Sequence, residues 1–154
     1  MSRLSSSRQA SRWLLAFFLF SILTVSVSAR ELKLEAKLIW GTNEEKSSEP
    51  SHKPVDPATA EKLRKVFKWK NYFVVTNQVK TIPSRGSGRF DLSKQCTIEI
   101  TELEGPEVEL KLIGEGKLIN KTKKKLNKGE WFAYAKDDKN DSAWFVIIAE
   151  LDEK

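Results

Sequence analysis

Cysteine and histidine are almost absent from this chain, which has one of each among its 154 residues. A single cysteine excludes an intramolecular disulfide and a cysteine cluster that would hold zinc or iron. The single histidine, His52, stands in a polar segment between Ser51 and Lys53, so a Ser-His-acid or Cys-His site would have to recruit a solvated loop residue. The sequence therefore predicts no metal and no cofactor, and it favours a protein that is not an enzyme.

Catalytic sequence motifs are also missing, because the chain has neither a nucleophile elbow nor a zinc-binding helix motif. One alternative stays open. With 21 Asp and Glu residues, two carboxylates from distant parts of the chain could meet in the fold and form the site of a small hydrolase.

Long hydrophobic runs are limited to one, near the start. Arg3, Arg8 and Arg12 precede an apolar run from Trp13 to Phe20, and the segment ends in the small residues 27–29. This order predicts a secretory signal peptide over residues 1–29, with Arg30 as the first residue of the mature protein. An uncleaved anchor needs about 20 apolar residues, whereas serine and threonine interrupt the second half of this segment. We therefore expect a secreted or periplasmic protein with no transmembrane segment after signal cleavage.

Excess charge is small once the leader is removed. The chain has 27 Lys and Arg against 21 Asp and Glu, and three of the arginines belong to the leader, which leaves 24 against 21, or +3. Together with export, this balance predicts no nucleic-acid partner. The 125 residues that remain of 154 suit a single domain over residues 30–154.

Alternating apolar residues predict strands along most of that domain. The segment 32–40 alternates Leu, Ala and Trp with Glu and Lys, and similar patterns recur over 69–82, 90–103, 108–112, 117–122, 130–136 and 143–151. The last two are apolar on both faces, which is typical of strands covered on both sides. We predict a mainly β fold, an antiparallel β-sandwich or a curled sheet of six or seven strands.

Two other segments break this pattern. Residues 41–57 are polar and rich in Ser, Glu and Pro, which predicts an exposed loop. Asp56 and Pro57 are typical of a helix start, and apolar residues at helical spacing predict one amphipathic α-helix over about 57–67. A helix of this kind should lie on the sheet.

Cys96 falls in a strand pattern, where it alternates with Ile98 and Ile100 on one face. This spacing predicts a buried structural cysteine rather than a reactive thiol.

A lysine cluster is the main charged feature of the domain. It comprises Lys117, Lys121, Lys123, Lys124, Lys125 and Lys128. Such a cluster can bind an anionic glycan or lipid headgroup, but lysines on an edge strand also deter edge-to-edge aggregation. We favour the second interpretation. Two sequons, at Asn120 and Asn140, would accept glycans only in a eukaryotic secretory route.

Tryptophans suggest a further alternative. Trp40, Trp69, Trp131 and Trp144 all lie in or beside strands, where core packing explains them, yet surface Trp and Tyr are also how sugar-binding modules stack on carbohydrate rings. Trp69 and Tyr72, next to Lys68 and Lys70, are the best candidates for such stacking.

These observations predict an exported, non-enzymatic β-rich domain that acts as a binding protein or as an envelope-associated structural protein. The alternatives are a carbohydrate-binding module and a small carboxylate-based hydrolase. An anionic glycan, an envelope surface or another exported protein is the expected kind of partner.

Overall fold

The computed structural model describes residues 30–152, so the predicted signal peptide lies outside the described residues. The fold is mainly β, with two antiparallel sheets and one helix, which confirms the predicted β-sandwich class. The elements, in chain order, are β1 (Leu32–Thr42), β2 (Lys53–Pro54), α1 (Pro57–Val66), β3 (Asn71–Ile82), β4 (Ser87–Ser93), β5 (Cys96–Glu104), β6 (Glu107–Gly114), β7 (Lys117–Lys125), β8 (Trp131–Asp138) and β9 (Ser142–Glu150).

The described chain has nine strands rather than six or seven. One additional strand is the two-residue β2. The other arises because the pattern over 90–103 is two strands: Ser93 pairs with Cys96, and the chain reverses between them. Lys94 and Gln95 at this turn are neither Gly nor Pro, so the sequence gives little sign of the reversal.

Sheet A has five strands in the order β2-β3-β1-β9-β8, and sheet B has four in the order β4-β5-β6-β7. Sheet B is a meander in which each strand pairs with its neighbour in sequence. In sheet A the first strand, β1, lies in the centre, where it pairs with β3 on one side and with the last strand, β9, on the other.

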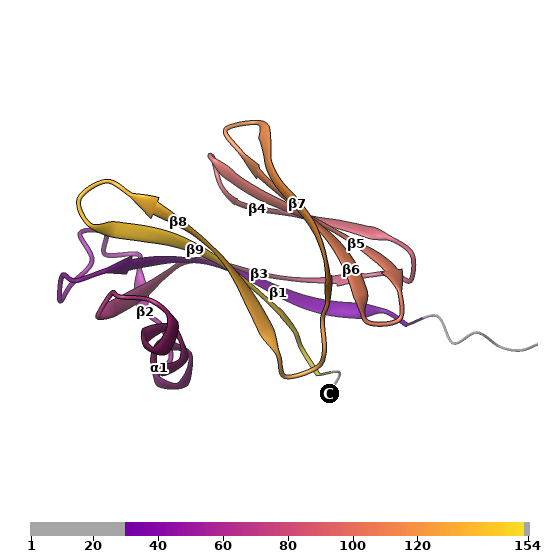
Figure 1. Ribbon diagram of the computed structural model, residues 1–154, viewed down its shortest axis with the longest axis horizontal. Helices are drawn as coiled ribbons and strands as arrows, with labels where there is room; N and C mark the ends of the chain where they lie inside the picture. The colour runs from indigo at the N-terminus through magenta and orange to yellow at the C-terminus, as the bar shows by residue number, and fades with distance from the viewer. Residues whose placement is uncertain (1–29, 153–154) are drawn as a thin grey trace, which may run out of the picture.

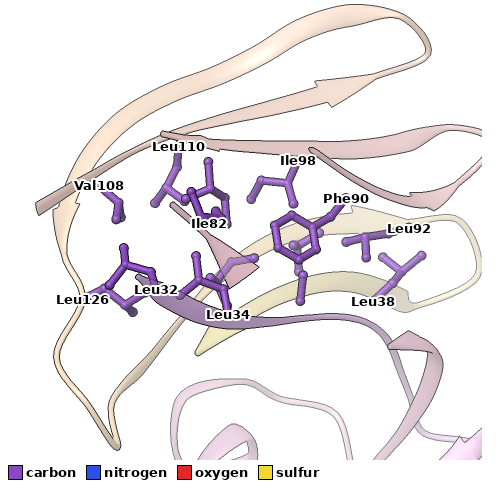
Figure 2. Close-up of a cluster of buried hydrophobic side chains, with 14 residues drawn as sticks. Leu32, Leu34, Leu38, Ile82, Phe90, Leu92, Ile98, Val108, Leu110 and Leu126 are labelled. Carbon is purple, nitrogen blue, oxygen red and sulfur yellow. The ribbon is translucent and has the colours of Figure 1, made fainter. Parts of the chain in front are cut away.

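Sheet A is covered on both faces, by sheet B on one and by α1 on the other (Figure 1). We call the buried cluster between the sheets the inter-sheet core; it is shown in Figure 2 and comprises Leu32, Leu34, Ala36, Leu38, Ile82, Phe90, Leu92, Ile98, Ile100, Val108, Leu110, Leu126, Val146 and Ile148. The helix-side core comprises Ile39, Val55, Ala60, Leu63, Trp69, Tyr72, Ala143, Phe145 and Ile147.

Strand β9 contributes to both cores in alternation. Val146 and Ile148 point into the inter-sheet core, whereas Phe145 and Ile147 point into the helix-side core. This confirms the prediction that the strand is covered on both sides.

Helix α1 follows its sequence prediction closely. The Asp56 carboxylate accepts a hydrogen bond from the Thr59 amide at 2.9 Å, which caps the helix N-terminus, and Pro57 occupies the first turn. Ala60 and Leu63 are its buried residues and hold it against sheet A.

The polar segment between β1 and α1 is shorter than the predicted 41–57. Strand β1 continues through Gly41 and Thr42, both buried, and the exposed stretch lies mainly within residues 43–54. A Cβ atom at position 41 would lie 2.7 Å from the Phe145 ring, so the close packing of β1 on the helix-side core requires glycine there.

Candidate functional site

The four outer strands of the two sheets differ in how their free backbone edges are protected. Unpaired N–H and C=O groups along an edge strand are a template for pairing with another chain, and proteins normally cover them, shorten them or charge them. The edge strands here are β2 and β8 of sheet A and β4 and β7 of sheet B.

The β4 edge is covered by side chains of β3. Gln78 Nε2 donates a hydrogen bond to the Asp91 carbonyl oxygen at 2.6 Å, and Lys80 Nζ donates to the Arg89 carbonyl oxygen. Two outward-facing carbonyls of β4 are thus satisfied from within the molecule. The β2 edge has only two residues, and Pro54 carries no N–H.

The β7 edge carries most of the lysine cluster, as the edge interpretation requires. Directly opposite residues of an antiparallel pair share a face. On the outer face, Lys123 and Lys125 lie opposite Glu109 and Glu107, and Lys121 Nζ lies 3.2 Å from Glu109 Oε2.

The remaining lysines of the cluster lie elsewhere. Lys124 is opposite the buried Val108, so it is on the face toward the inter-sheet core. Lys117 is the first residue of β7, opposite Gly114, and Lys128 lies in the connection to β8. The six lysines are therefore spread over two faces of β7 and the connection that follows it, and some of them are paired with acids. Anion binding by them stays a prediction, and their placement suits edge protection better.

Strand β7 carries two exposed apolar side chains directly after its first residue, Leu118 and Ile119. They lie at a bulge, since the pairing with β6 shifts register between Leu112 and Ile113. A bulge is itself a device that interrupts pairing at an edge.

The β8 edge has none of these protections. Its first five residues, Trp131–Ala135, carry no charge, and charges begin only at Lys136. Within residues 30–152 its outer backbone groups have no partner strand, and no side chain bonds to them as Gln78 bonds to β4. This unprotected edge is the candidate functional site.

The side chains beside this edge are only partly covered. Phe132 and Tyr134 pack against the inter-sheet core with their rings edge to face at 5.9 Å, and Trp131 and Ala133 pack against the helix-side core. All four are half-buried. A neighbouring strand along β8 would lie beside these partly exposed apolar side chains.

The predicted sugar-stacking residues are in the interior, which corrects that expectation. Trp69 is 5% exposed and Tyr72 is 3% exposed. Both rings pack edge to face on Phe145, and Trp69 Nε1 donates a hydrogen bond to the Asp141 carbonyl oxygen at 2.9 Å. Stacking on a sugar needs an open ring face, and neither residue offers one.

Cys96 packs against the inter-sheet core, on the predicted face of its strand, but it is half-buried rather than buried. Burial raises the pKa of its thiol, which lowers the fraction of reactive thiolate at neutral pH.

His52 is less solvated than expected. It is half-buried, its Nδ1 lies 2.8 Å from Ser47 Oγ, and its ring lies beside that of Trp40 at 6.4 Å. The same Ser47 hydroxyl accepts a hydrogen bond from the Glu49 amide. Ser47 and His52 therefore help to hold the turn over residues 47–52 together.

A small cleft lies between α1 and the start of β3, with Arg64, Asn71 and Tyr72 among its lining residues. Its volume of about 180 Å³ is below the roughly 300 Å³ at which ligand pockets usually begin. Across residues 30–152, no three His, Cys, Asp or Glu side chains gather as a metal site.

Comparison with known proteins found no match to this chain among protein-family models, curated proteins or solved structures. In the part of the chain that the structure describes, no helix is long and apolar enough to cross a membrane.

Proposed function

We propose that this protein is an exported, non-enzymatic binding domain that takes up an extended strand of another exported polypeptide chain along the edge of β8. Strand addition of this kind gains affinity from main-chain hydrogen bonds and specificity from alternate side chains. The observation that carries the proposal is the contrast among the edges: β4 is covered and β7 is charged, while β8 is unpaired and uncharged over Trp131–Ala135.

The expected export rests on the leader pattern in residues 1–29. Its test is the intact mass of protein recovered from outside the cytosol, which should show Arg30 at the amino terminus. Full-length chain recovered in the membrane would contradict it.

Strand addition can be tested with a synthetic peptide in which Val alternates with Thr, flanked by lysines for solubility. We expect it to shift the NMR amide signals of residues 131–138 in a saturable way, because these are the backbone groups that would acquire partners. A peptide of the same composition with proline at its centre serves as the control, since proline lacks the N–H that pairing needs.

A variant of the protein gives the matching control. Ala135→Lys adds to β8 the kind of charge that guards β7, at a position that is already exposed, so the fold should tolerate it. Gln95→Lys adds the same charge in the exposed turn between β4 and β5. The proposal requires Ala135→Lys to lose peptide binding and Gln95→Lys to keep it. Equal binding by both variants, or peptide signals confined to another edge, would refute it.

A further inference from the structure

We infer that the strand received by β8 is β8 of a second copy of this chain, paired antiparallel about a two-fold axis at Ala133. This inference rests on the proposed function, because it names the partner for the same edge. Two-fold dimers are the commonest symmetric assembly, and they bring the same surface of each subunit together.

The sequence around β8 selects this register. With Ala133 opposite its own copy, Phe132 falls opposite Tyr134, and Trp131 falls opposite Ala135. Glu130 then falls opposite Lys136, and symmetry repeats this oppositely charged pair at the other end. Aromatic pairs and opposite charges directly across antiparallel strands are both stabilising.

Neighbouring registers that keep the same faces together fit less well. A centre at Tyr134 would place Glu130 opposite Asp138 and Trp131 opposite Asp137, which opposes like charges and sets a carboxylate against an aromatic ring. A centre at Phe132 would pair only residues 131–133 of β8 and would place Lys136 opposite Lys128, which again opposes like charges. The register at Ala133 is the one that matches both charge and apolar character.

Burial supports the same arrangement. Phe132 and Tyr134 share the face of sheet A toward the inter-sheet core, and Trp131 and Ala133 share the face toward the helix-side core. In the Ala133 register each face of one copy continues into the same face of the other, so half-buried apolar side chains on both faces gain neighbours. A pairing of five strand residues, 131–135, with one oppositely charged pair at each end is small for a protein interface, and we expect a dimer that forms with rising concentration.

The test is sedimentation of the exported chain, from residue 30, over concentrations up to about millimolar, where small interfaces associate. Wild type should convert from monomer to dimer. Lys136→Glu and Glu130→Lys should each weaken the dimer about tenfold, because each change sets like charges against each other at both symmetric positions; this corresponds to about 1.4 kcal/mol. The double variant should restore the dimer.

Restoration is the decisive result, because it cannot arise inside one chain. Lys136 is six residue steps along the chain from Glu130, a distance of about 20 Å at roughly 3.3 Å per step, and screening at physiological salt acts over about 8 Å. Rescue by the double variant therefore requires that the two positions face each other between copies. Lys139→Glu, at the exposed tip beyond β8, is the matched control and should leave the dimer unchanged.

The outcomes separate this inference from the proposed function. A wild type that stays monomeric, or single variants that weaken the dimer with no rescue, overturns the inference. If the Val-Thr peptide still binds residues 131–138 and Ala135→Lys still abolishes that binding, the proposed function survives and the edge takes a different protein. If the wild type neither forms the dimer nor binds the Val-Thr peptide at residues 131–138, the inference and the proposed function are both overturned.

Discussion

Leu63→Ala should remove a large part of the stability that α1 gives to the fold. Leu63 is fully buried in the helix-side core, and with Ala60 it is one of two residues that hold the helix on the sheet. The change deletes three carbon atoms, which at about 0.8 kcal/mol each is about 2.4 kcal/mol of lost burial. The cavity left behind brings the expected loss of unfolding free energy to about 3–5 kcal/mol.

Such a loss is large beside the total of about 5–15 kcal/mol that is usual for a domain. Urea unfolding followed by tryptophan fluorescence measures it directly, because Trp69 belongs to the same core. Val66→Ala is the matched control, because Val66 is on the same helix but 71% exposed. This variant should lose no more than about 0.5 kcal/mol of unfolding free energy. A loss below about 1 kcal/mol for Leu63→Ala, or equal losses for both variants, would show that α1 is not held by this contact.

Three further predictions concern single features of the fold. Cys96→Ser should lower the unfolding free energy by about 1–3 kcal/mol by placing a hydroxyl beside the inter-sheet core, and native Cys96 should react slowly with a thiol reagent; rapid labelling would contradict its burial. Asp56→Ala should cost about 1 kcal/mol through loss of the helix cap. The Thr59 amide holds the pKa of Asp56 below its ordinary value of 3.8, so this contribution is complete above that pH and disappears as the pH falls through the lowered value, and urea titrations of both proteins should converge in acid. The last prediction replaces four lysines of β7 with Gln, namely Lys121, Lys123, Lys124 and Lys125. The free energy of unfolding should hardly change, but light scattering from aggregates should increase. Loss of salt-sensitive binding to an anionic glycan without aggregation would instead favour an anion site.

Local patterns in the sequence were sufficient for features that depend on neighbouring residues. Period-two alternation located β1, and the continuous apolar run of β9 both located that strand and indicated a cover on each side. Asp56 and Pro57 fixed the start of α1, because capping is a property of a few adjacent residues.

Features that depend on distant contacts could not be read in this way. Trp69 and Tyr72 stand beside exposed lysines in sequence, but they point inward because α1 and Phe145 lie over them. The free edge of β8 follows from the pairing of β1 with β9, which joins opposite ends of the chain. An apolar strand looks the same in sequence whether it is central or at an edge, so the candidate site itself was missed.

The place of β1 between β3 and β9 also sets an order of events during synthesis. Residues leave the ribosome in sequence, so β1 lacks one of its two neighbours until residues 142–150 have been made. Strands β4 to β7 pair only with adjacent strands and can close much earlier, since local contacts form faster than distant ones. A nascent chain can therefore hold the meander while the larger sheet stays open, and the arrival of β9 closes that sheet and fills both cores at once.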